Sequence, residues 1–331
     1  MLHPANFCFQ IKRDMMKRSK KGLLAFIILI ITANLTPAKI SAQELSGNIS
    51  ISGAFALYPI TVKWAEEFKK QHPKVKIDIQ AGGAGKGITD VLSKVTDVGL
   101  VSRDLNNAEL KKKAFAIAVT KDAVIPTISA TSPFKAVLYK RGIKKEALNN
   151  IFITGKYKTW NTLGFTSPAP IHVYTRSDAA GAAETWAHYF GKKQEDLQGV
   201  AVFGDPGLAQ AVKRDPSSIG FNNIVYIYDT KTNKPTNGVV PVPIDLNNNG
   251  KLDPDENFYG DINQLIAAVA AGKYPSPPAR DLYFVTNGKP SNPIVKAFIK
   301  YILTDGQKYV LEAGYIKLPK GKLNTELAKV K

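Results

Sequence analysis

The chain has 331 residues, with 45 lysines and arginines against 27 aspartates and glutamates, which gives a formal net charge of +18. Its length is comfortable for two domains, and its 44% hydrophobic and 22% charged residues are ordinary for a globular protein. This composition excludes a disordered chain, a collagen-like chain and a disulfide framework, and the presence of only one long apolar run excludes a polytopic membrane protein.

The first element in chain order is an N-terminal targeting segment. Basic residues between Lys12 and Lys21 precede an apolar core at 23–31, which has the length of a signal-peptide core and is short for a membrane span. Small residues up to Ala42 follow this core. We therefore predict a signal peptide over residues 1–42 and an exported protein, located in the periplasm or cell envelope. An uncleaved membrane anchor is the alternative.

Removal of the targeting segment changes the charge and the chemistry of the chain. Residues 1–42 hold seven basic residues, one acidic residue and the only cysteine, so the remaining chain has a net charge of +12 and no thiol. A thiol nucleophile and a zinc–thiolate site are therefore excluded. The positive charge favours an anionic ligand, but the lysines are scattered without interleaved aromatic residues, so we expect no nucleic-acid partner.

Strands alternate with helices along the rest of the chain. Apolar patterns predict strands at 47–52, 75–79 and 97–101, with helices between them at 60–71 and 88–94. The later expected elements are a strand at 171–175, a helix at 182–190, a buried strand region at 219–227, a helical stretch at 261–271, a strand at 281–286 and a helix at 293–303. This alternation predicts an α/β fold of mostly parallel sheets flanked by helices.

Glycine-rich junctions connect a strand to a helix at 53–59, 82–87 and 176–181. In open α/β sheets, ligands bind beyond the carboxyl ends of the strands, where the N-termini of helices point. The free amides and the dipole of a helix N-terminus suit an anion, and glycine lets the backbone approach it closely. The junctions therefore predict an anion-binding cleft, although each one alone is also explained as a tight turn.

Several segments match, in order and spacing, the motifs of one known family. They are Ile51–Pro59, Gly82–Gly87, Asp97–Arg103, Ile151–Lys156 with Trp160-Asn161, Arg176–Gly181, and a C-terminal group of Tyr274-Pro275, Leu282-Tyr283, Gly306-Gln307 and Gly314-Tyr315. Through these motifs the chain, from about Ser46 to Leu318, resembles the periplasmic phosphate-binding proteins of phosphate ABC transporters, which have the type II periplasmic-binding-protein fold.

The resemblance implies two lobes joined by two crossing strands. The first lobe is expected at 43–126 plus 281–331, and the second at 127–280. The ligand, a small tetrahedral oxyanion and most simply inorganic phosphate, is expected between the lobes, which close on it by a hinge motion without any chemistry. The implied partner is an ABC transporter permease, and we expect the protein to be a monomer and not an enzyme.

The resemblance also implies a set of ligand-binding residues in these loops. They are Ala54, Phe55, Ala56, Leu57, Ala84, Gly85, Lys86, Ser102, Arg103, Arg176, Ala180, Gly181 and Ala182. The family usually places serine or threonine hydroxyls at several of these positions, whereas here only Ser102 keeps one. Backbone amides and the two arginines must then supply the donors, with Asp104 or Asp178 accepting a ligand proton. The alternative for each arginine is an ion pair within the chain.

A second motif, at 245–256, fits the twelve-residue calcium loop. Its ligand positions hold Asp245, Asn247, Asn249, Lys251 (through the backbone carbonyl), Asp253 and Glu256, and Gly250 occupies the position of the sharp turn. Proline-broken chain precedes the loop, so it is not half of a paired helix–loop–helix, and we predict a structural Ca²⁺ ion. An asparagine-rich turn without metal is the alternative.

Two rival functions use the same fold and the same oxyanion-binding turns. An exported phosphatase-like enzyme needs a nucleophile or a metal cluster at these loops, and the loops themselves contain no Gly-x-Ser-x-Gly or Ser-x-x-Lys motif. A surface protein or anion sensor without a transport role has no distinguishing sequence feature. Solute binding for uptake is the function that the sequence favours.

Overall fold

Strands and helices alternate through the first half of the chain, as the apolar spacing predicts. The computed structural model describes residues 44–236 and 238–331, so the predicted signal peptide at 1–42 lies outside the described residues. The first elements are β1 (Gly47–Gly53), α2 (Tyr58–Gln71), β2 (Val75–Ala81), α3 (Ala84–Leu92), β3 (Val98–Val101), α4 (Asn107–Lys111) and β4 (Ala114–Ser129).

The second half continues with shorter strands and ends in helices. Its elements are α5 (Lys135–Arg141), β5 (Ile143–Lys144), α6 (Lys145–Phe152), β6 (His172–Arg176), α7 (Gly181–Tyr189), β7 (Val200–Val202), α8 (Gly204–Arg214), β8 (Ser218–Asn223), β9 (Val239–Pro241), β10 (Ile244–Asp245), α9 (Ile262–Ala270), β11 (Ala279–Asn287), α10 (Pro293–Leu303) and α11 (Lys320–Lys329). Short 3₁₀ segments lie at Trp160–Leu163, Gln194–Asp196, Ile224–Tyr226 and Asp305–Tyr309.

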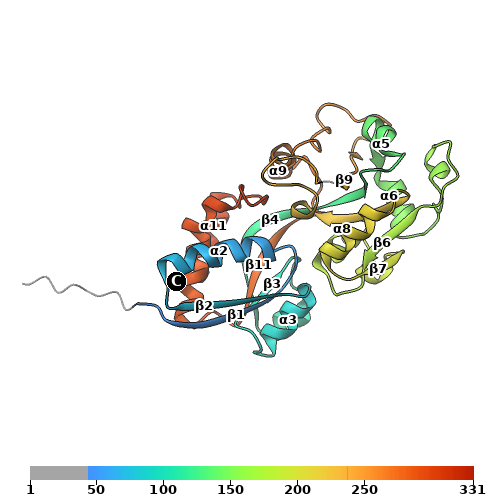
Figure 1. The fold of residues 1–331 in the computed structure, drawn as a ribbon. Coiled ribbons are helices and arrows are strands. Elements are labelled where there is room, and N and C mark those ends of the chain that lie inside the picture. Colours follow the sequence, from blue (N-terminus) through green and yellow to red (C-terminus); the bar gives the residue numbers. More distant parts are fainter. Residues whose placement is uncertain (1–43, 237) are drawn as a thin grey trace, which may run out of the picture. The chain divides into compact units, whose positions relative to one another are not determined.

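Most of the strands belong to one sheet with the order β2-β1-β3-β11-β4-β8-β6-β7, and β9 also pairs with β4 (Figure 1). β1 is parallel to β2 and β3, and β6 is parallel to β7 and β8. Between these two parallel groups, β11 and β4 run antiparallel to their neighbours. A separate pair of short strands, β10 and β5, is parallel.

The apolar core of Leu45–Lys331 consists of two clusters. One contains buried residues from 49–119 and 282–330, and we name this part lobe I. The other contains buried residues from 123–279 together with Ile316, and we name it lobe II. The chain passes from one cluster to the other within β4 and within β11, so these two strands are the crossing strands.

Two predicted boundaries are wrong. The second helix begins at Ala84 and not at Ile88, because Gly83, with φ +92°, ends the preceding strand segment and the small residues after it fit a first helical turn. The buried region at 219–227 is not a single strand, since β8 ends at Asn223 and a 3₁₀ turn follows. The helix predicted at 293–303 is confirmed with the same bounds.

Helix α3 lies directly on the backbone of the sheet. A Cβ atom on Gly99 of β3 would lie 2.4 Å from the carbonyl oxygen of Gly87 in α3, and one on Gly87 would lie 2.7 Å from the carbonyl oxygen of Leu100. Glycine is therefore required on both sides of this contact, which fixes where the N-terminus of α3 points. Among the described residues, no helix is long and apolar enough to cross a membrane.

We expect Gly99→Ala to destabilise the protein by about 1–3 kcal/mol, because the added methyl group must push α3 away from β3. Urea unfolding measures this change. Gly321→Ala is the control, because a Cβ atom at this exposed position in α11 would meet no atom within 4 Å, and we expect it to be neutral or slightly stabilising. Equal stability of the two variants would contradict the close packing of α3.

Candidate functional site

The structure brings the predicted ligand loops together where lobe I faces lobe II. The amide of Gly85, in the first turn of α3, donates to the carbonyl oxygen of Ala179 at 2.9 Å. A Cβ atom on Gly181, at the start of α7, would lie 2.3 Å from the hydroxyl of Ser102. The Tyr226 hydroxyl donates to the carbonyl oxygen of Phe55 at 3.0 Å. Segments that are far apart in the sequence therefore face one another at one place.

Four helices begin at this place: α2, α3, α7 and α8. In none of the four does the side chain of the N-cap residue bond the helix amides, although the Gly204 amide at the start of α8 donates to Asp178 Oδ1 at 3.1 Å. By contrast, Asn106, Asp261 and Asn292 cap α4, α9 and α10. The starts of α5, α6 and α11 are also uncapped, so a missing cap alone does not mark a site. What distinguishes the four is that their starts face each other across the lobes, where orphan amides favour an anion.

Arg176, the last residue of β6, is the most buried cation of the predicted set, with its side chain 1% exposed. Its Nε and Nη2 donate to the two carboxylate oxygens of Asp178 at 2.9 and 2.6 Å, and its Nη1 donates to Asp205 at 2.5 Å. Burial opposes the charge of Arg176, but the two carboxylates outweigh burial and raise its pKa. Three of the five N–H donors of a guanidinium are thus in use, and two remain for a ligand.

An aromatic ring covers the Arg176 guanidinium. The centre of the Phe55 ring lies 5.5 Å from the central carbon of the guanidinium, within the range of a cation–π contact. Phe55 also meets Phe203 edge to face at 5.7 Å, and Phe203 is 61% exposed. A Cβ atom on Gly204 would lie 2.9 Å from the Phe55 ring, so the first loop and the start of α8 are in close contact.

The other two predicted cations pair with acids of their own lobe. Arg103 holds Glu109 with two bonds of 2.9 and 2.7 Å and also donates to the backbone oxygen of Asp104. The bond to Glu109 raises the pKa of Arg103 against the opposing effect of burial. Lys86 pairs with Asp90 one turn further along α3. Of the three predicted cations, Arg176 is the one that contacts the first predicted ligand loop, through the Phe55 ring.

A buried polar chain connects Arg176 to the crossing strands, and the sequence analysis missed it. Asp205, which holds Arg176, also accepts a bond from Asn223 Nδ2 at 2.6 Å. The amide oxygen of Asn223 accepts in turn from Arg280 Nη2 at 2.5 Å. Arg280 on β11 is the direct pairing partner of Asp122 on β4, and their charged groups are 3.7 Å apart. Arg176 is thus linked to the point where both strands cross between lobes.

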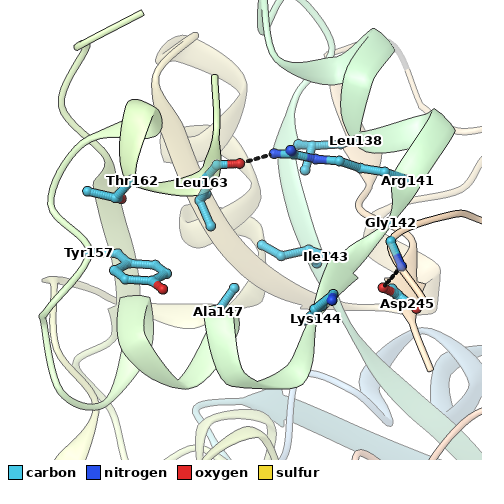
Figure 2. A pocket seen from close by; sticks show the side chains of 11 residues that line it. Leu138, Arg141, Gly142, Ile143, Lys144, Ala147, Tyr157, Thr162, Leu163 and Asp245 are labelled. Carbon is cyan, nitrogen blue, oxygen red and sulfur yellow. Dashed lines mark hydrogen bonds between the residues drawn. The ribbon is translucent and has the colours of Figure 1, made fainter. Parts of the chain in front are cut away.

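The predicted calcium loop lies in lobe II, directly after β10, and it flanks a cavity of about 320 Å³. Asp245 and Gly250 of the loop contribute to the wall of this cavity, and Figure 2 shows Asp245 on the side away from Tyr157. Among the described residues, no group of three or more Asp, Glu, His or Cys side chains is arranged closely enough to hold a metal ion, and this includes the loop as it stands here.

Comparisons with known proteins agree with the fold. The family described as "PBP superfamily domain" matches residues 39–306, and the chain belongs to this superfamily. The phosphate-binding protein PstS of Bacillus subtilis is 27% identical over 277 residues, which cover 83% of this chain and 82% of the relative. The phosphate-binding protein PstS of Pseudomonas aeruginosa is 27% identical over 305 residues, which cover 84% and 85%.

One similar solved structure comes from Clostridium perfringens and is provisionally described as a phosphate ABC transporter substrate-binding protein with bound phosphate. It is 24% identical, has a TM-score of 0.68, and the match covers 82% of this chain and 100% of the other. The predicted α/β fold of the type II periplasmic binding proteins is thereby confirmed, as is the family resemblance.

We expect the buried pair on the crossing strands to make stability depend on pH. No hydrogen bond reaches the Asp122 carboxylate, and burial raises its pKa to about 7, above the ordinary value of about 4. The folded protein then holds a proton that the unfolded chain has already lost, so stability falls as pH rises from about 4 to 7 and levels off above.

Asp122→Asn should remove this contribution, which amounts to a few kcal/mol. Urea unfolding at several pH values between 4 and 8 measures it, with the exposed Asp255→Asn as the control of equal charge change. Parallel pH profiles for wild type and Asp122→Asn would contradict this assignment.

Proposed function

We propose that this protein is an exported solute-binding protein that captures inorganic phosphate between its lobes and delivers it to an ABC transporter permease. The observation that carries the proposal is the meeting of four uncapped helix starts around Arg176. Backbone amides supply donors where the usual hydroxyls are replaced by alanine and phenylalanine, and the Arg176 guanidinium supplies further N–H donors. The curated relatives, which are named phosphate-binding proteins, support the choice of phosphate.

The charges around Arg176 favour an oxyanion that still carries a proton. One guanidinium faces two carboxylates, so the cluster has a net charge of −1 when both acids are ionised. A fully ionised anion such as sulfate meets these carboxylates without a proton to share. Monohydrogen phosphate instead can donate its hydroxyl proton to Asp178. The Asp178 carboxylate lies beside the start of α3, because a Cβ atom on Gly83 would be 2.6 Å from its Oδ2. We therefore propose selectivity for phosphate over sulfate.

Transport rather than catalysis is the role that these residues support. The relatives that match most of this chain are named as binding proteins and not as enzymes. The facing loops present amides, alanines, Arg176, carboxylates that are held by hydrogen bonds and the Ser102 hydroxyl, and a phosphatase needs an adjacent base or a metal cluster to activate such a hydroxyl. A signal peptide at 1–42, location in the periplasm or cell envelope, and a monomeric state are parts of the same proposal.

Calorimetric titration with phosphate, sulfate and molybdate tests the ligand. We expect phosphate to bind with a dissociation constant of about 10 µM or lower, and sulfate at least about 100-fold more weakly, because it lacks the shared proton. Tight binding of sulfate or molybdate, with no binding of phosphate, would overturn the proposal of phosphate as the ligand but would still fit a solute-binding protein. Hydrolysis of p-nitrophenyl phosphate by the purified protein would instead favour the enzyme.

Arg176→Lys tests the position of the site. Lysine keeps a positive charge near Asp178 and Asp205 but loses the planar fork, so we expect phosphate affinity to fall at least about tenfold while the protein stays folded. Arg214→Lys, at the exposed end of α8, is the matched control and should bind like wild type. A folded Arg176→Lys protein with unchanged phosphate affinity would remove Arg176 from the site.

A further inference from the structure

The loop at 245–256 presents oxygen atoms at the spacing of a calcium loop, and its backbone has the required turn. Gly250 has φ +80°, in the left-handed region, and a Cβ atom there would meet nothing within 4 Å, so conformation rather than packing explains the glycine. The backbone amide of Asn249 donates to the side-chain oxygen of Asn247 at 3.0 Å, and the backbone amide of Lys251 donates to the side-chain oxygen of Asn249 at 2.8 Å. These features fit a calcium loop but also fit an asparagine-rich turn.

The first ligand position distinguishes the two interpretations. Asp245 is 1% exposed, and its Oδ2 accepts the amide of Gly250 at 2.9 Å, so its carboxylate is directed into the loop. The other oxygen, Oδ1, is buried and accepts no hydrogen bond from any described residue. A buried carboxylate oxygen without a partner is costly, and an asparagine-rich turn gives no reason for it. A cation inside the loop would contact this oxygen and so explain its position.

Glu256, at the last ligand position, is bonded to the start of the loop. Glu256 is 4% exposed, and its Oε1 accepts the amides of Leu246 and Asn247, each at 2.9 Å. The carboxylates of the first and twelfth positions are thereby both turned toward the same short stretch of chain. In calcium loops, these two positions close the coordination sphere from opposite ends.

The ninth position explains why the acids are not gathered into a metal cluster in this structure. The Asp253 Oδ2 accepts from the side-chain amides of Asn247 and Asn249 at 2.8 and 2.7 Å. Two NH₂ groups thus partly neutralise this carboxylate. Rotation of each amide by half a turn about its last side-chain torsion turns the oxygen toward Asp253 in place of the nitrogen, and gives up the bonds that these oxygens accept from the backbone amides of Asn249 and Lys251.

We propose that this loop binds one Ca²⁺ ion through Asp245, Asn247, Asn249, the backbone carbonyl of Lys251, Asp253 and Glu256. Three carboxylates and three neutral oxygens form a set of hard ligands, and their charge of −3 exceeds the charge of the ion by one. Such a flexible oxygen sphere suits Ca²⁺, whereas Mg²⁺ requires a smaller octahedral arrangement. Affinity in the millimolar to sub-millimolar range is typical of exported calcium modules.

The contacts around the loop give the ion a structural role in lobe II. In the strand pairing of β10 with β5, Asp245 stands opposite Lys144. The backbone amide of Leu252 donates to the carbonyl oxygen of Lys140 in α5 at 3.0 Å. A Cβ atom on Gly142 would lie 2.8 Å from the Asp245 amide, so the end of α5 rests against the first ligand. An ion in the loop would therefore stabilise the wall of the 320 Å³ cavity that Asp245 and Gly250 line (Figure 2).

Titration of the chelator-treated protein with calcium chloride tests this proposal. We expect one Ca²⁺ per chain, a dissociation constant of about 1 mM or lower, and a melting temperature that rises with calcium concentration and falls on chelation. Magnesium should bind at least about tenfold more weakly. No binding heat and no thermal shift up to about 10 mM calcium would overturn the proposal.

Two substitutions with the same change of charge locate the ion. Glu256→Gln removes the two-oxygen ligand at the twelfth position, and we expect calcium affinity to fall at least about 100-fold. Asp255→Asn changes the exposed neighbouring residue and should bind calcium like wild type. If Glu256→Gln does not fold, Asn249→Ala at an exposed ligand position should still weaken calcium about tenfold. Unchanged calcium affinity in a folded ligand variant would place the ion elsewhere and overturn the assignment.

Discussion

The ion pairs of Arg176 are the interaction on which the account of the site depends. A guanidinium that is 1% exposed is stable only because Asp178 and Asp205 hold three of its N–H groups. Removal of one partner would leave an uncompensated buried charge, so the cluster fixes the guanidinium at the end of β6. This fixed position places the guanidinium against the Phe55 ring of lobe I, 5.5 Å from the ring centre.

The same cluster extends to the two crossing strands, β4 and β11. Asp205 is bonded to Asn223, and Asn223 to Arg280, which pairs with Asp122 across the two crossing strands. A change of charge around Arg176 would therefore be felt at Arg280 and Asp122, on the strands that connect the lobes. A buried polar network with members on both crossing strands offers a physical route by which ligand binding and lobe closure are coupled.

The sequence predicts the backbone of the site better than its charges. Glycines and apolar spacing correctly indicate the strand-to-helix junctions, although Ala84 to Gly87 belong to the helix itself. The start of α8 was missed because the preceding strand, Val200–Val202, has only three residues, which is too short for its apolar residues to show a strand period. Arg103 pairs with Glu109, and the capping box that Glu109 forms with Asn106 was a readable local signal. The partners of Arg176 beyond Asp178 come from distant segments, which spacing along the chain does not reveal.

In the proposed function, amides from facing helix starts and Arg176 hold one anion together. A crystal structure of the protein with phosphate measures this most directly. The account predicts phosphate oxygens within hydrogen-bond distance of the Arg176 Nη atoms and of backbone amides at the starts of α2, α3 and α7. Phosphate bound at another place, with Arg176 contacting only its two aspartates, would contradict it.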